Sequence, residues 1–234
     1  MHKLRKIFSK TSYLYKKTYS KLEGLIFRLC GLDEVTGFKI YNSFGKLESL
    51  GTTYGAWTIP SEVLNPESVC YLVGAGEDIS FDCALVQKYK CPVYIFDPTP
   101  RAIEHFEQLV AKTKEGVRMR INNSTDISYK INSKELSKLH YLNYGIWKEN
   151  GVQKFFAPKK KEWVSHAITK TQNTDEYFEA VCKTVESVMK ELNHNKIELL
   201  KLDVEGAEYE IISNILTTGI QPKIICVEFD EINF

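Results

Sequence analysis

Short apolar segments alternate with amphipathic segments from residue 68 onward. Five runs rich in β-branched and aromatic residues predict strands at 68–74, 91–97, 139–147, 197–203 and 223–229. Between them, the apolar positions recur at helical spacing, which predicts helices at about 79–89, 100–113, 184–192 and 207–216. Strands that alternate with helices form βαβ units. The pattern therefore predicts an α/β fold with a mostly parallel sheet.

One segment of this domain interrupts the alternation. Residues 149–163 read "ENGVQKFFAPKKKEW", and Asn150-Gly151 is a dipeptide favoured in tight hairpin turns. We therefore expect an inserted hairpin around 147–174, within a domain that covers 68–234.

The chain before this domain divides into two parts. Residues 1–31 carry eight basic residues against one acidic residue, and the basic positions share one face of a helix beside an apolar face. Such a basic amphipathic helix either lies on an anionic membrane surface or docks its apolar side on the protein. Residues 32–67 are rich in Gly, Ser and Thr and predict a linker and lid, in which Tyr54 and Trp57 either stack on a sugar or cap the core.

Composition narrows the class of protein. The 234 residues are 43% hydrophobic, enough for one core of ordinary size, and 31 basic residues nearly balance 30 acidic ones. This balance argues against a dedicated nucleic-acid binder. The six cysteines form no CxxC pair and no Cys/His cluster, so neither a zinc ribbon nor a disulfide framework is indicated. Free thiols and the lack of an apolar run of roughly 18 residues favour a cytoplasmic location.

The ends of the first two predicted strands carry features of a nucleoside site. In "YLVGAGEDISFD", Gly74 and Gly76 let the backbone approach a ligand at the start of a helix. The dinucleotide motif needs a third glycine where Ile79 stands, so these glycines alone also fit a simple tight turn. Asp97 ends the second strand, where its carboxylate can accept hydrogen bonds from ribose hydroxyls. Alternatively, Asp97 shapes the turn before a helix that begins at Pro100.

The fourth strand ends in "KLDVEGAE", which places Asp203 and Glu205 at a junction between strand and helix. Carboxylates are favourable there because the helix dipole is positive at its N-terminus. The junction also belongs to the same edge of the predicted sheet as Gly74 and Asp97.

Several segments together resemble the FkbM-type S-adenosylmethionine-dependent methyltransferases, over about residues 70–229. They match in order and spacing: "YLVGAGEDISFD", "VYIFDPTP", "YGIW" followed by "NGVQKFF", "CKTVESVMKEL", "LLKLDVEGAEYEII" and "IICVEF". The resemblance implies a Rossmann-like class I methyltransferase fold with helices on both faces of the sheet and S-adenosylmethionine as the methyl donor. It also implies O-methylation of a sugar or another small hydroxylated metabolite, often in surface polysaccharide synthesis.

The resemblance also implies roles for individual residues. Those of the donor site would be Gly74, Gly76 and Glu77 around methionine and ribose, Asp97 on the ribose hydroxyls, and Thr99, Asn143 and Gly145 near the adenine. Asp203 and Glu205 would face the methyl group and the acceptor. Either carboxylate can remove the acceptor proton or bind a divalent cation that acidifies the acceptor, although no metal-ligand set is apparent. His166 either contacts the acceptor or is an ordinary surface residue.

Three departures from the family pattern leave an alternative open. In the first loop, Leu72 stands where an acidic residue is common and Asp78 where a third glycine is common. Asp230 stands where a histidine is common, and the sequence ends at Phe234. A full class I sheet continues beyond its fifth strand, so we expect either that the chain lacks the C-terminal strands or that its N-terminal segment covers what those strands normally cover. The alternative function is a catalytically inactive protein that binds a nucleoside or a partner. A dehydrogenase is disfavoured by Ile79.

Overall fold

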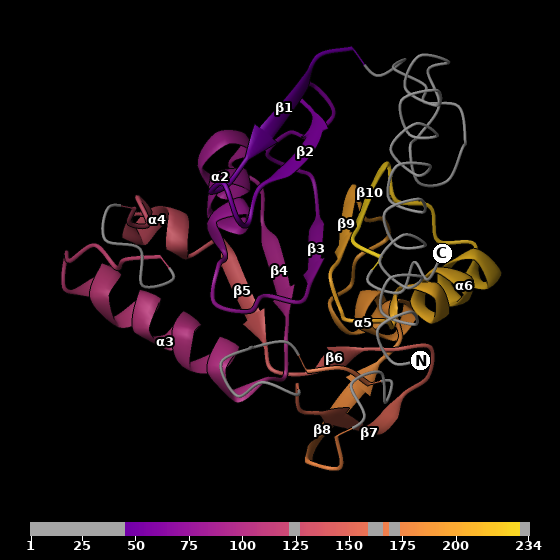
Figure 1. Ribbon diagram of the computed structural model, residues 1–234. Helices are drawn as coiled ribbons and strands as arrows, with labels where there is room; N and C mark the ends of the chain where they lie inside the picture. Colours follow the sequence, from indigo (N-terminus) through magenta and orange to yellow (C-terminus); the bar gives the residue numbers. More distant parts are fainter. Residues whose placement is uncertain (1–44, 122–126, 159–165, 169–173, 230–234) are drawn as a thin grey trace, which may run out of the picture. The chain divides into compact units, whose positions relative to one another are not determined.

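A five-stranded parallel sheet forms the centre of the computed structural model, which describes residues 45–121, 127–158, 166–168 and 174–229 (Figure 1). The strands lie in the order β10-β9-β3-β4-β5. Their bounds are β3 Cys70–Val73, β4 Val93–Phe96, β5 Leu139–Leu142, β9 Leu199–Leu202 and β10 Ile224–Val227. All four strand pairs are parallel. The predicted α/β fold class is confirmed, and each core strand lies within a predicted run.

Helices cover both faces of this sheet. Figure 1 shows α2 (Ser80–Tyr89), α3 (Pro100–Lys114) and α4 (Ser133–Leu136) on one face, and α5 (Val185–Glu191) and α6 (Glu208–Thr218) on the other. Every residue of β3 and β9 is buried, because both faces of these central strands are covered. This two-sided burial explains why both strands read as continuous apolar runs. The four predicted helices begin and end within two residues of α2, α3, α5 and α6.

The strand order reverses beside β3. From β3 the chain adds β4 and then β5 outward, returns to place β9 on the other side of β3, and ends with β10. The carboxyl ends of β3 and β9 therefore lie side by side where the direction of winding changes. In open α/β sheets this position forms a crevice in which ligands bind.

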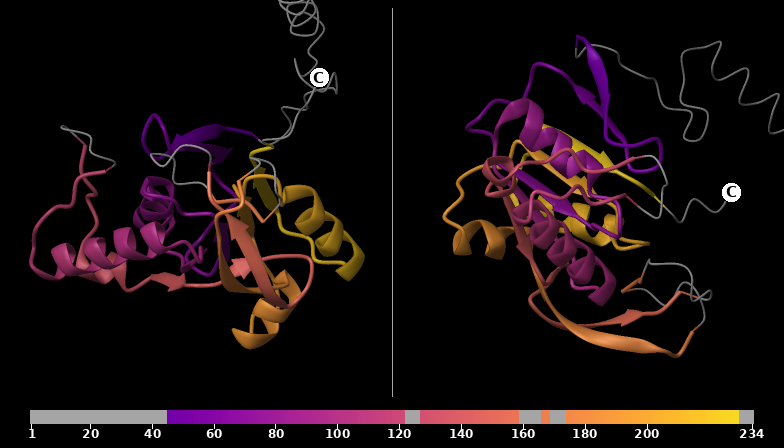
Figure 2. Two further views of the ribbon diagram at one scale, coloured as in Figure 1. Left: turned by 60° about the horizontal axis from the view of Figure 1, so that its bottom comes forward. Right: turned by 90° about the vertical axis from the view of Figure 1, so that its left-hand side faces the viewer.

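Two smaller sheets lie beside the central one. β1 (Leu47–Leu50) and β2 (Trp57–Pro60) form an antiparallel hairpin within the region predicted as a linker and lid. β6 (Gly145–Ile146), β8 (Tyr177–Lys183) and β7 (Gly151–Phe156) form a three-stranded sheet in that order. In the right-hand view of Figure 2 the hairpin lies at the top and the three-stranded sheet at the bottom, with the central sheet between them. The predicted helix at 1–31 lies outside the described residues.

The inserted hairpin differs from its prediction. β7 pairs with β8, and this hairpin extends to Lys183, beyond the predicted range of 147–174. Asn150-Gly151 is not the turn of a hairpin, because Gly151 is already the first residue of β7. β7 pairs instead with β8, in which more and less exposed side chains alternate. This pairing brings Phe178 against Phe155, with ring centroids 5.2 Å apart.

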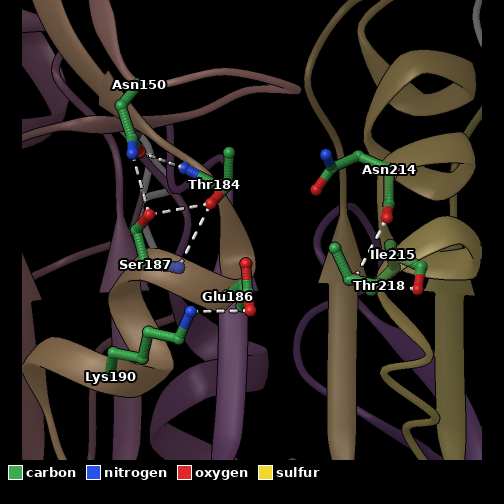
Figure 3. A network of polar contacts seen from close by, with 8 residues as sticks. All are labelled: Asn150, Thr184, Glu186, Ser187, Lys190, Asn214, Ile215 and Thr218. Carbon is green, nitrogen blue, oxygen red and sulfur yellow. Dashed lines mark hydrogen bonds and ion pairs between the residues drawn. The ribbon is translucent and has the colours of Figure 1, made fainter.

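Asn150 has a different role, which Figure 3 shows. Its Oδ1 accepts a hydrogen bond from the Thr184 backbone N–H at 2.9 Å, and its Nδ2 donates to Ser187 Oγ at 2.9 Å. Thr184 caps α5, since its Oγ1 accepts from the Ser187 backbone N–H at 3.1 Å. The residue before β7 is thus tied to the start of a helix that packs on the central sheet.

None of the helices in the described ranges is long and apolar enough to cross a membrane.

The cap of α5 predicts a measurable contribution to stability. Thr184→Ala removes the acceptor for the Ser187 N–H, and we expect it to lower the free energy of unfolding by about 1 kcal/mol. Thr217→Ala is the matched control, because the exposed Thr217 hydroxyl donates only to a carbonyl one turn earlier in α6. It should change stability by less than about 0.5 kcal/mol. Urea unfolding of both variants measures the difference, and equal losses would contradict the capping role.

Candidate active site

One cavity of about 670 Å³ lies at the carboxyl ends of the parallel strands. Its walls come from the loops after β3, β4 and β9, from the end of β10, from the tip of the β1–β2 hairpin, and from the three-stranded sheet. This volume falls within the range of roughly 300–1,000 Å³ that is usual for small-molecule sites. The cavity therefore occupies the crevice that the strand order predicts.

Backbone contact between the ends of β3 and β9 forms the floor of the cavity. Gly74 has a φ of +84°, and a Cβ at this position would lie 1.9 Å from the carbonyl oxygen of Asp203. Only glycine satisfies both the backbone conformation and the close approach. The Asp203 N–H in turn donates to the carbonyl of Val73 at 3.1 Å, so the two strand ends are fixed together.

Lys201 links the same two strand ends through its side chain. It is 5% exposed, and its Nζ donates to the Gly74 carbonyl oxygen at 2.6 Å and pairs with Asp203 Oδ2 at 3.0 Å. The ammonium also lies 5.5 Å from the centroid of the Trp57 ring, which comes from the hairpin. A sequence alone does not show on which side of a strand a residue such as Lys201 lies. The strand register places it in the cavity wall, where it holds Asp203 in position.

The hairpin tip is docked on the loop after β3. The Thr52 hydroxyl donates to Asp78 Oδ2 at 2.6 Å, and the Thr52 N–H donates to Ser80 Oγ at 2.8 Å. Tyr54 lies at this tip and also lines the cavity, with 88% of its surface exposed. The region predicted as a lid thus contributes one wall of the cavity, and a large aromatic side chain stands free beside it.

Asp97 is fully engaged by backbone and side-chain donors. Its Oδ2 accepts from the N–H groups of Ala75 at 2.8 Å and Gly76 at 3.1 Å. Its Oδ1 accepts from the N–H and the hydroxyl of Thr99, at 2.8 and 2.7 Å. Since a carboxylate offers about four lone-pair sites, Asp97 anchors the glycine loop to the start of α3. A bond to a ribose hydroxyl would have to replace one of these donors, and that role stays a prediction.

Glu208 fixes the turn after β9, and the sequence analysis missed it. Its side chain is buried, and Oε1 accepts from the N–H groups of Val204 at 3.1 Å and Gly206 at 3.2 Å. These bonds hold Glu205 at a φ of +53°, a conformation that costs a residue with a side chain about 1 kcal/mol. The sequence feature that could have revealed this role is a glutamate at the start of a predicted helix, because such side chains often accept hydrogen bonds from the free N–H groups there.

The cavity is strongly acidic. Its carboxylates are Glu77, Asp78, Asp82, Asp97, Asp203, Glu205 and Glu228, and Lys201 is the one lysine or arginine among the lining residues that the structure describes. Burial raises the pKa of Asp82 from 3.8 to about 6; Asp78 and Asp203 add to this rise, while Lys201 opposes it. Loss of hydration, together with Asp203 and Glu205, also raises the pKa of Glu228. This lining favours a cationic ligand and places proton-accepting groups inside the site.

The structure brings most of the predicted site residues together. Those that line the cavity are Gly74, Gly76, Glu77, Asp97, Thr99, Gly145, His166, Asp203 and Glu205. Asn143 does not line it, because this residue is exposed just beyond the end of β5. Glu77 reaches the cavity while both of its oxygens pair with Arg101, at 3.0 and 2.7 Å. Within the described ranges, no three His, Cys, Asp or Glu side chains are arranged to hold a metal ion.

Comparisons with known proteins give one family. Residues 73–234 match the family described as the methyltransferase FkbM domain. A solved structure, the methyltransferase FkbM from Methylobacillus flagellatus KT, is similar to the chain at 10% sequence identity and a TM-score of 0.39. The similarity covers 65% of this chain and 30% of that one, so the chain spans less than a third of the solved chain's length. No curated protein matches the chain.

The contact between Gly74 and Asp203 predicts different costs for two neighbouring glycines. Gly74→Ala should lower the free energy of unfolding by about 3 kcal/mol or more, because the methyl group forces β3 and β9 apart. At Gly76 an added Cβ meets no atom within 4 Å, so Gly76→Ala should cost only the backbone strain, about 1 kcal/mol. Denaturant unfolding compares the two variants. Similar losses would show that the strand ends are not in rigid contact.

The raised pKa of Asp82 predicts that the difference in stability between the wild type and Asp82→Asn depends on pH. Its folded-state pKa, about 6, lies above its ordinary value of 3.8. The folded protein therefore binds more protons than the unfolded chain between these values, and this group's contribution to stability falls as pH rises through the window. Asp82→Asn should gain on the order of 3 kcal/mol relative to wild type between about pH 4 and about pH 7.

Urea unfolding at several pH values measures this gain, with the exposed Glu62→Gln as the control for loss of one carboxylate. The control should follow the wild type across the range. A constant difference between Asp82→Asn and wild type would show that Asp82 is ionised throughout.

Proposed function

The chain belongs to the methyltransferase FkbM domain family, and from this premise we propose that it transfers a methyl group from S-adenosylmethionine to a hydroxyl group. The acceptor in this proposal is a sugar of a surface glycan or another small hydroxylated metabolite, methylated in the cytoplasm. The observation that carries the proposal is the convergence of the glycine loop, Asp97 and the Asp203–Glu205 turn on one cavity.

The charge of the cavity and the open space beside Gly76 support S-adenosylmethionine as the donor. S-adenosylmethionine supplies a methyl group bonded to a positively charged sulfur. Seven carboxylates around one lysine favour such a cation over an anion. Gly76 supports close approach of a ligand, since its backbone borders the cavity and no atom lies within 4 Å of where a Cβ would stand.

Within this proposal the residues divide by position. The loop of Gly74, Gly76 and Glu77 holds the methionine and ribose part of the donor, and Asp97 fixes that loop by accepting hydrogen bonds from its N–H groups. Thr99 and Gly145 border the part of the cavity proposed for the adenine. The exposed Asn143 has no contact with the cavity and receives no role here.

In this proposal, proton removal from the acceptor falls to the carboxylates after β9 and β10. As the oxygen–methyl bond forms and the sulfur–methyl bond breaks, the hydroxyl proton must pass to a base. Asp203 is held by Lys201 at 3.0 Å, and Glu205 is presented by the turn that Glu208 fixes. Glu228 lines the same wall, and its raised pKa makes it a better proton acceptor than an ordinary glutamate.

The acceptor would enter beside the hairpin tip. The Tyr54 ring is exposed and borders the cavity, and an aromatic face packs well on the apolar side of a sugar ring. His166 lines the cavity as well, with its ring centroid 5.2 Å from that of Phe178. Their place in the cavity lining supports the inference that both side chains contact the acceptor.

Two measurements test the proposal. Calorimetry should detect binding of S-adenosylhomocysteine, and an assay of its release from S-adenosylmethionine across a panel of sugars should identify an acceptor. Asp203→Asn or Glu205→Gln should then lower kcat/KM by about a hundredfold or more, while binding of S-adenosylhomocysteine is retained.

Glu210→Gln is the matched control, because Glu210 lies on the same helix-turn segment but pairs with Lys148 on the exposed surface. It should leave turnover unchanged. Failure to bind S-adenosylhomocysteine would refute the proposed donor, and full activity of both site variants would refute the proposed base.

A further inference from the structure

A second cavity, of about 540 Å³, runs along α3. Its charged lining residues are Glu77, Arg101, Glu104, Lys112, Arg118 and Arg120. Glu77 also lines the larger cavity, so the two spaces adjoin at the Glu77–Arg101 ion pair. We call this second space the α3 groove.

The sequence builds the groove from one helix face and one extended segment. Residues 101, 104, 108 and 112 of α3 follow steps of three or four and therefore share a face. After α3 the chain turns back, with the Val117 N–H donating to the Lys112 carbonyl at 2.8 Å. Met119 is then buried, and its carbonyl accepts from the Tyr129 N–H at 2.9 Å.

This anchoring sets the direction of the neighbouring arginines. Side chains alternate along an extended segment, so Arg118 and Arg120 project away from the buried Met119, on the same side. Both are exposed, and Arg120 is held by an antiparallel bridge to Ser128. The two guanidinium groups are thus presented by a backbone that is already fixed.

The positive charges of the groove are not balanced. Arg101 is neutralised by the two-point pair with Glu77, and Glu104 accepts a hydrogen bond from the uncharged Gln108 at 3.1 Å. Among the described residues, Lys112, Arg118 and Arg120 make no ion pair. Three cations therefore share the groove with one carboxylate that pairs with none of them. An anion placed between these like charges would relieve their repulsion.

We propose that the α3 groove binds the phosphate group of a small phosphate ester. A guanidinium group offers two parallel N–H donors that match two phosphate oxygens, and Lys112 adds a flexible ammonium. The space accommodates a molecule the size of a sugar phosphate, and its charge is opposite to that of the acidic cavity beside it. A phosphate group is therefore attracted to the groove and repelled by the acidic cavity.

Calorimetry on the full chain tests this site with inorganic phosphate, glucose 1-phosphate and glucose. Both phosphates should bind the wild type and glucose should not. The double variant Arg118→Gln/Arg120→Gln should weaken phosphate binding by about tenfold or more. The control Lys114→Gln/Lys134→Gln removes the same charge from exposed positions outside the groove and should bind as the wild type does.

The results show which phosphate compound the groove prefers and whether the anion binds in the groove. Tighter binding of glucose 1-phosphate than of inorganic phosphate would show that the groove takes the sugar ester, and equal binding that it takes the free anion. For each phosphate, the affinity should be the same with and without an excess of S-adenosylhomocysteine, because that ligand is proposed to occupy the other cavity. Equal weakening by the two double variants, or absence of phosphate binding by the wild type, would overturn the proposal whether or not the proposed methyl transfer holds.

Discussion

The backbone contact between Gly74 and Asp203 is the constraint on which the site depends. It joins β3 to β9 at the point where the strand order reverses, and it leaves no room for a side chain at residue 74. Lys201 adds a buried hydrogen bond and an ion pair across the same junction. With the two strand ends fixed, the loop of Gly74 and Gly76 and the turn of Asp203 and Glu205 line one cavity, and Trp57 of the hairpin forms part of its wall.

The carboxylates around the cavity have two different roles. Asp97 and Glu208 are buried and accept hydrogen bonds from backbone N–H groups, so each fixes a loop. Asp203 and Glu205 stand on a turn that Glu208 fixes, and they border the cavity. The acidic residues of this region therefore combine structural and chemical roles, and Asp97, which accepts four hydrogen bonds within the protein, has little capacity left for a ligand.

The sequence predicted the central fold well because strands buried on both faces are continuous apolar runs. The hairpins were harder: β1 and β2 are four residues each, and β8 pairs with β7 across a long connection that carries no turn signal. The glycines and carboxylates at the strand ends line one cavity, since parallel strands bring these ends to one edge, and their roles in binding and catalysis stay predictions. The orientation of Lys201 depends on register and the clamp by Glu208 on loop geometry, neither of which a single sequence shows.

A crystal structure of the chain with S-adenosylhomocysteine would show directly whether the ends of β3 and β9 form the donor site. We expect this ligand in the 670 Å³ cavity, between the loop of Gly74 and Gly76 and the turn of Asp203 and Glu205. The Lys201 contacts with Gly74 and Asp203 should persist in the complex. A ligand bound outside this cavity, or a complex in which the ends of β3 and β9 have separated, would contradict the account.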